Sequence, residues 1–181
     1  MHFTNDSLMG IFLAAGTGYG RVMTMRRAGA LTASTALFGL AGLHAAWGVG
    51  SAWPAADRRA LAGAVIGVRP GPDAGPQDSG MPGAGACFAV SGALAAAGAL
   101  VAGWPARRWP RLHRLGTCGV VGVLASRGTL GLTGQTRLVS PVSESERFRR
   151  LDRRIYSPAC LALAALSMLA LPGHTSAPQA D

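Results

Sequence analysis

Four apolar segments, separated by charged or proline-rich connections, account for most of this chain. They cover residues 28–50, 83–104, 115–134 and 155–171. A helix needs about 20 predominantly apolar residues to cross the hydrocarbon core of a bilayer, and each segment is close to that length. Backbone polar groups find no water in lipid, so each segment is expected to be helical. The pattern therefore predicts an all-α fold, a four-helix transmembrane bundle.

The connections between these segments differ in composition. Residues 51–82 are rich in proline and glycine, which predicts a loop rather than one regular element. Residues 105–114 form a short basic turn, and residues 135–154 are polar with an arginine-rich end. Apolar residues in this last connection recur three and then four positions apart and so share one helical face: Phe148, Leu151 and Ile155. This spacing predicts a short interfacial amphipathic helix before the last span.

The ends of the chain are expected to lie outside the membrane domain. Residues 1–27 contain an apolar stretch that is broken by glycines and is too short to span, so we expect a tail that is not part of the fold. A signal peptide is the alternative interpretation of residues 28–50, because Arg26 and Arg27 precede an apolar run. The later spans favour a retained helix. Residues 28–171 then form one four-span domain, and residues 172–181 are a disordered tail.

Composition supports the membrane interpretation. The chain is 49% hydrophobic but only 6% aromatic, with 26 glycines, and small residues let helices approach closely in lipid. The net charge of +9 comes from arginines in short clusters beside the apolar runs, which argues against a nucleic-acid partner. Three cysteines without CxxC spacing predict no metal and no cofactor. Cys87 and Cys160 are expected to be reduced thiols, with a disulfide as the alternative.

Four spans place both chain termini on one side of the membrane and the two long connections, 51–82 and 135–154, on the other. Arginines flank the spans in similar numbers on both sides, so charge alone gives little orientation. The Arg26-Arg27 pair before the first span favours cytoplasmic termini.

Polar and aromatic side chains in the spans lie near the end that carries the long connections. His44 and Trp47 are one turn apart near the end of the first span, and Arg127 is within two turns of the end of the third. Tyr156 opens the fourth span, and Asp152 precedes it by one turn. If helices alternate in direction, all four spans contribute side chains to one leaflet.

Arg127 carries the strongest inference, because an arginine within a span costs at least about 2.5 kcal/mol and usually has a partner. The candidate partners are the acids of the following connection: Asp152, Glu146 and Glu144. One interpretation is a structural lock or a side chain that reaches the interface. The other is a ligand site, with Arg127 and Trp47 as contacts and with His44, Asp152 and Tyr156 as candidate catalytic acids or bases.

A longer pattern resembles a known family. The chain contains His44-Ala-Ala-Trp47, then Arg127-Gly, and then Phe148-Arg-Arg-Leu-Asp152-Arg-Arg-Ile-Tyr156-Ser-Pro-Ala-Cys160. Over roughly residues 28–171 this resembles the bacterial membrane family called domain of unknown function 3995. The resemblance implies a small four-helix protein of the bacterial cell membrane. It implies no activity, and the long first loop and the N-terminal stretch depart from the family pattern.

Two functions are compatible with these observations. The first is a non-catalytic membrane protein whose polar residues are structural or contact a ligand. The second is a membrane-embedded enzyme, for example a cyclase, that acts on a lipid or isoprenoid-like substrate entering from the bilayer. A transporter is less favoured, because the chain shows no inverted repeat. The non-catalytic protein and the enzyme are expected to differ in geometry. If the protein is an enzyme, Arg127, His44 and Asp152 should share a cavity. If the role is structural, Arg127 should be paired.

Overall fold

The computed structural model describes residues 5–68, 71, 79–135 and 145–171, with side chains from residue 20 onwards. It is helical, and no strand occurs within these ranges, which confirms the all-α prediction. The elements are α1 (Asn5–Gly48), α2 (Arg58–Val65), α3 (Ala84–Val101), α4 (Pro110–Thr133), α5 (Glu146–Leu151), the π-helix η2 (Asp152–Tyr156) and α6 (Ser157–Met168).

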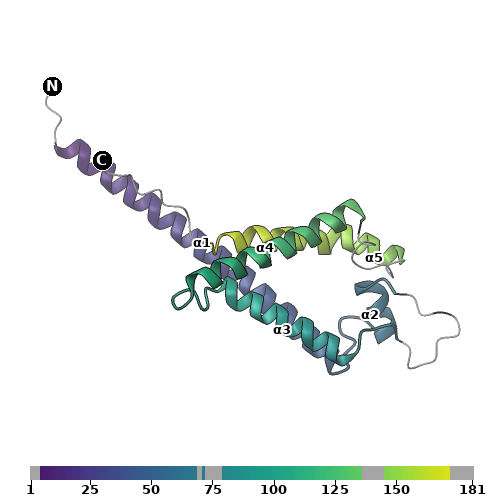
Figure 1. The fold of residues 1–181 in the computed structure, drawn as a ribbon. Helices are drawn as coiled ribbons and strands as arrows, with labels where there is room; N and C mark the ends of the chain where they lie inside the picture. The colour runs from purple at the N-terminus through teal and green to yellow at the C-terminus, as the bar shows by residue number, and fades with distance from the viewer. Residues whose placement is uncertain (1–4, 69–70, 72–78, 136–144, 172–181) are drawn as a thin grey trace.

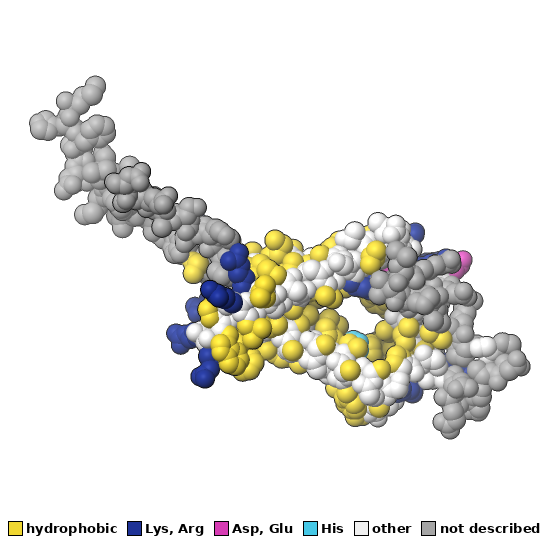
Figure 2. Space-filling model, viewed as in Figure 1, with side chains coloured by type: hydrophobic (Ala, Val, Ile, Leu, Met, Phe, Trp, Pro, Cys, Tyr) yellow, Lys and Arg dark blue, Asp and Glu magenta, His cyan; other side chains and the backbone are white. Residues whose placement is uncertain are grey.

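The long helices form two pairs (Figure 1). Helix α1 packs mainly against α3, and α4 packs mainly against α6. The pairs meet around a core of Ala33, Leu37 and Val101, against which Val120 and Leu163 of the second pair also pack. They separate towards the end where α2 and α5 lie, and the space-filling view shows an opening between them there (Figure 2).

Three helices are long and apolar enough to cross a membrane: residues 20–48 of α1, α3 and α4. Helix α6 has 12 residues, which is too few to span alone. The structure therefore supports a membrane protein with three candidate spans, one fewer than the sequence predicted. The physical reason is that the predicted segment 155–171 is divided between the end of η2, the 12 residues of α6 and a turn after Met168, so that no α-helix of spanning length forms there.

The first helix begins well before the predicted boundary at residue 28. Helix α1 runs without a break from Asn5 to Gly48. Arg26 donates from Nε to the carbonyl oxygen of Leu169 at 3.3 Å and from Nη2 to that of Leu171. A cation beside the last carbonyls of a helix offsets their partial negative charge. Arg26 thus ties α1 to the end of α6. The predicted C-terminal tail, residues 172–181, lies outside the described residues.

The predicted first loop contains a short helix. Asp57 accepts a hydrogen bond from the backbone N–H of Ala60 at 2.7 Å, which caps the start of α2. Leu61 and Ala62 are the buried residues of this helix. The amphipathic signal was hidden by the glycines and prolines around it.

The predicted amphipathic helix exists as α5, but it continues directly into η2 and α6. The prediction that Phe148, Leu151 and Ile155 share one face is wrong for Ile155. Phe148 is buried, whereas Ile155 is 54% exposed. The π-helix adds a residue to its turn, so side chains beyond Leu151 are rotated out of the register of an α-helix.

Candidate functional site

Arg127 of α4 and Asp152 of η2 form a short ion pair. Arg127 Nη2 lies 2.6 Å from Asp152 Oδ1, and the Asp152 side chain is only 1% exposed. The sequence named Asp152 among three candidate partners. Of the others, Glu146 lies 3.9 Å from Arg149 and is 79% exposed, and Glu144 falls outside the described residues. An opposite charge is needed where water is excluded, because an isolated carboxylate there is costly.

Two glycines of α4 make room for this pair. A Cβ on Gly131 would lie 2.8 Å from Arg127 Nη1 and from Asp152 Oδ2 and would overlap Ser157 Oγ. A Cβ on Gly128 would lie 2.9 Å from the Ser157 carbonyl oxygen. The repeat of glycine at every third position therefore places a bare backbone stripe of α4 against the start of α6.

The hydroxyl of Ser157 completes the cluster. Ser157 is fully buried, and its Oγ donates to Asp152 Oδ1 at 3.2 Å. The π-turn brings these two residues together, because the Ser157 N–H bonds the Asp152 carbonyl five residues earlier. Arg127 Nη1 is buried and finds no hydrogen-bond partner among the described residues. We refer to Arg127, Asp152, Ser157 and Gly131 as the ion-pair cluster.

Tyr156 turns away from this cluster. Its hydroxyl donates to the carbonyl oxygen of Ala64 in α2 at 3.2 Å, and its ring centroid lies 6.3 Å from that of Phe148. Tyr156 therefore connects the second helix pair to α2, the short helix between α1 and α3 in the chain.

His44 and Trp47 lie apart from the ion-pair cluster, near the end of α1. Their ring centroids are 4.7 Å apart, so the prediction that they share a face of α1 is confirmed. His44 Nδ1 lies 2.9 Å from the Leu40 carbonyl oxygen, and Trp47 Nε1 donates to the Trp53 carbonyl oxygen at 2.7 Å. Since a carbonyl can only accept, Nδ1 is the donor in this contact.

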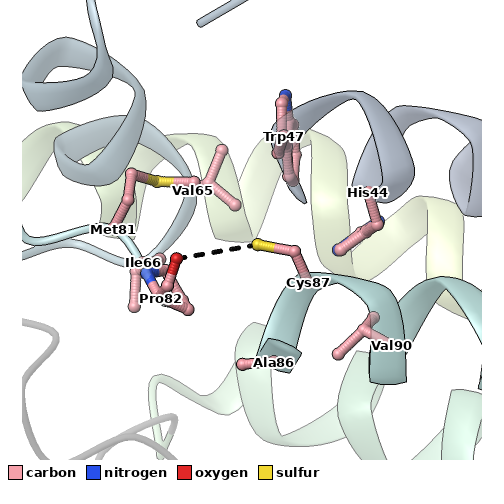
Figure 3. A pocket seen from close by; sticks show the side chains of 9 residues that line it. All are labelled: His44, Trp47, Val65, Ile66, Met81, Pro82, Ala86, Cys87 and Val90. Carbon is pink, nitrogen blue, oxygen red and sulfur yellow. Dashed lines mark hydrogen bonds between the residues drawn. The ribbon is translucent and has the colours of Figure 1, made fainter. Parts of the chain in front are cut away.

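Both rings line a pocket of about 120 Å³ between α1, α2 and α3 (Figure 3). Its walls are mostly apolar, with one thiol and one thioether: His44, Trp47, Val65, Ile66, Met81, Pro82, Ala86, Cys87 and Val90. The Cys87 sulfur is directed at the Pro82 carbonyl oxygen, 3.7 Å away. Figure 2 shows a histidine side chain at the opening between the helix pairs.

The predicted residues thus divide into two groups. The structure brings Arg127 and Asp152 together, and it brings His44 and Trp47 together, but the described pocket contains neither Arg127 nor Asp152 nor Tyr156. The thiols of Cys87 and Cys160 are free. Among the described residues no three His, Cys, Asp or Glu side chains are grouped as a metal site.

His113 is a buried histidine that was not singled out from the sequence. His113 is 5% exposed, and its Nε2 lies 2.9 Å from the Leu100 carbonyl oxygen near the end of α3. The sequence placed it in a basic turn. Pro110 was the available signal, since proline favours the first position of a helix, and it indeed begins α4.

Comparison with known proteins gives a family without an assigned activity. Searches of curated proteins and of solved structures returned no match. A family model described as "Protein of unknown function (DUF3995)" matches residues 37–167, which include both groups of residues described above. The match covers more than half of the chain, and the chain therefore belongs to the DUF3995 family.

Proposed function

We propose that this protein is a non-catalytic, four-span membrane protein in which the ion-pair cluster holds the last two spans in one register. The observation that carries the proposal is the 2.6 Å contact between Arg127 and an aspartate that is 1% exposed. A buried pair of this kind is satisfied in one arrangement of α4 and α6, and sliding either helix by one turn leaves both charges unpaired.

In this proposal the fourth span lies in the continuous helix made of α5, η2 and α6, whose arginine-rich start reaches the headgroup region. The three parts of this helix have 6, 5 and 12 residues and follow one another without a gap. Of the charges that precede the apolar stretch, Asp152 is compensated by Arg127, and the exposed arginines of α5 and η2 are placed at the membrane surface. Paired charges facing a neighbouring helix are tolerated in a membrane, whereas lipid-facing ones are not. The chain termini are then on the same, cytoplasmic side of a bacterial cell membrane.

An enzyme would need its acids and bases at one reaction centre. His44, Asp152 and Tyr156 were the candidates, and each has a structural hydrogen bond in a different place: to Leu40, to Ser157 and to Ala64. No geometric observation favours general acid–base catalysis, so catalysis is not proposed.

The pocket beside His44 supports binding of a small lipophilic molecule as the second part of the proposal. Its volume of about 120 Å³ is close to that of an apolar cavity of about 150 Å³ that accepts benzene. A small aromatic ring matches this lining, which is mostly apolar and has the Trp47 ring as one wall.

Accumulation in the membrane tests the lock. We expect Arg127→Ala to reduce the amount of inserted, monodisperse protein severalfold, because Asp152 then remains buried without its cation. Arg149→Ala is the matched control, since it removes an exposed arginine of the 3.9 Å pair, and we expect near-normal accumulation. Normal accumulation and unchanged stability of Arg127→Ala would refute the structural role.

Occupancy of the pocket can be tested separately with methyl-labelled methionine. We expect phenol to shift the NMR signal of the Met81 methyl group, which is in the pocket lining, and not that of Met168, which is 56% exposed on α6. Ala86→Leu should abolish the Met81 shift by filling the pocket. Equal shifts at both methyl groups would mean non-specific partitioning and would remove this part of the proposal.

A further inference from the structure

Four arginines line a surface groove along α5 and η2. The groove has a volume of about 470 Å³, and its lining is Glu146, Arg149, Arg150, Arg153 and Arg154. The arginines are two adjacent pairs, and they lie on one side of the helix because all four line the same groove. All four are exposed. We call these four residues the arginine face.

The arginine face lies level with the end of a spanning helix. Helix α4 is long enough to cross a membrane and ends at Thr133, followed by Gly134 in a left-handed conformation. The side-chain atoms nearest to the position of a Cβ on Gly134 belong to the Arg153 guanidinium. A helix that spans the hydrocarbon ends at the headgroup region, so Arg153 is at the depth of lipid phosphates.

The charge of the groove is strongly positive. Glu146 is the one acid among its lining residues, and it is 3.9 Å from Arg149 and 79% exposed, which makes it a weak partner. Asp152 lies on the same helix but faces α4, where it is buried against Arg127. The two acids of this helix therefore leave the groove with an excess of positive charge.

We propose that the arginine face binds the phosphate of an anionic phospholipid in the adjacent leaflet. Guanidinium groups hold phosphate oxygens through paired N–H donors, and the planar fork suits this geometry better than a lysine would. Basic residues close to a span bind anionic lipid through the same attraction. The proposal rests on the membrane insertion proposed above but not on the lock or on the pocket.

Lipid titration of the full-length protein in detergent, read by native mass spectrometry, tests the proposal. We expect phosphatidylglycerol to bind more tightly than phosphatidylcholine. The combined variant R149Q/R150Q/R153Q/R154Q should lower phosphatidylglycerol affinity by at least about tenfold. Glu146→Gln should raise it, because the groove loses its one lining acid.

The turn between α3 and α4, at the other end of the long helices, offers a matched control of equal charge. Arg107, Arg108, Arg111 and Arg114 lie in and after the turn between α3 and α4. The combined variant R107Q/R108Q/R111Q/R114Q removes the same charge and should lower phosphatidylglycerol affinity clearly less than the α5 variant does, because it reduces the general attraction and leaves the groove intact. If the α5 variant accumulates poorly, the smaller variant R150Q/R154Q serves in its place.

Three results would overturn the proposal. Equal losses in the two combined variants would mean attraction to net charge without a site. Equal binding of the two lipids would mean that the phosphate charge is not recognised. Full displacement by inorganic phosphate at millimolar concentration would assign the groove to a soluble anion. Insertion is measured independently, so a protein that inserts but does not select lipids refutes this inference alone.

Discussion

The two helix pairs of this protein are joined by different means. Helices α1 and α3 are linked by hydroxyl groups: Ser34 Oγ donates to the Gly98 carbonyl oxygen at 2.9 Å, and Ser91 Oγ donates to the Ala41 carbonyl oxygen at 2.8 Å. Helices α4 and α6 are linked by an ion pair between Arg127 of α4 and the buried Asp152 of η2, which runs directly into α6. Serine-to-carbonyl bonds can form in several registers, because every residue has a carbonyl. An ion pair fixes one register. In this protein the ion pair occurs at the irregular π-turn of η2, whereas the regular helices α1 and α3 are joined by hydroxyl groups.

Removal of the buried Asp152 carboxylate should have the largest effect on the free energy of unfolding. We expect Asp152→Ala to lower the free energy of unfolding by about 3–5 kcal/mol, because Arg127 then lacks its counter-charge and Ser157 its acceptor. Unfolding in mixed detergent measures this. If Asp152→Ala lowers the free energy of unfolding no more than substitution of an exposed residue does, the ion pair does not distinguish the α4–α6 pair from the α1–α3 pair.

An added methyl group in the ion-pair cluster should have the second largest effect on stability. Gly131→Ala places a methyl group against Arg127, Asp152 and Ser157, and we expect a destabilisation of about 1–3 kcal/mol. Gly119→Ala on the same helix is the control, because nothing lies within 4 Å of its Cβ position. The control should be neutral or slightly stabilising, since alanine favours a helix. Equal effects at both glycines would contradict close packing at Gly131.

The serine hydrogen bonds between α1 and α3 should contribute less to the free energy of unfolding. Ser34→Ala removes one buried donor to α3, and interhelical hydrogen bonds in membranes average about 0.6 kcal/mol. Thr32→Ala is matched to it, because Thr32 Oγ1 bonds the Ala28 carbonyl oxygen within its own helix. A thermal shift for Ser34→Ala as large as that for Asp152→Ala would show that hydroxyl groups also act as a lock.

The exposed ion pair should contribute least. Glu146→Ala breaks a contact of 3.9 Å at the surface, and we expect a change below about 0.5 kcal/mol. The same unfolding measurement applies, and a loss of more than about 1 kcal/mol would mean that α5 is held by more than its packing.

The sequence predicted which residues contact each other better than it predicted where the two groups of residues lie relative to one another. Asp152 could be named as a partner of Arg127 because a charge inside an apolar segment requires one, and His44 and Trp47 could be paired because they lie three residues apart. Their separation into two groups could not be predicted, because helix periodicity fixes the face of a side chain but not the gap between two helix pairs.

Local irregularity explains the remaining differences. The π-turn at Asp152–Tyr156 has no recognised sequence signal, and it turned Ile155 to the surface and Tyr156 towards Ala64. The continuous start of α1 and the contacts of Arg26 with the end of α6 depend on packing between distant segments. Such contacts do not follow from apolar length, which is the measure that defined the spans.

The most direct test of the account is a double-mutant cycle at Arg127 and Asp152, measured as the free energy of unfolding in mixed detergent. The single variants Arg127→Met and Asp152→Leu each leave one charge without its partner. The double variant leaves none, and apolar replacements of a buried pair are often tolerated. We predict that the double variant is more stable than either single variant. A double variant whose loss equals the sum of the two single losses would contradict an ion-pair lock between α4 and α6.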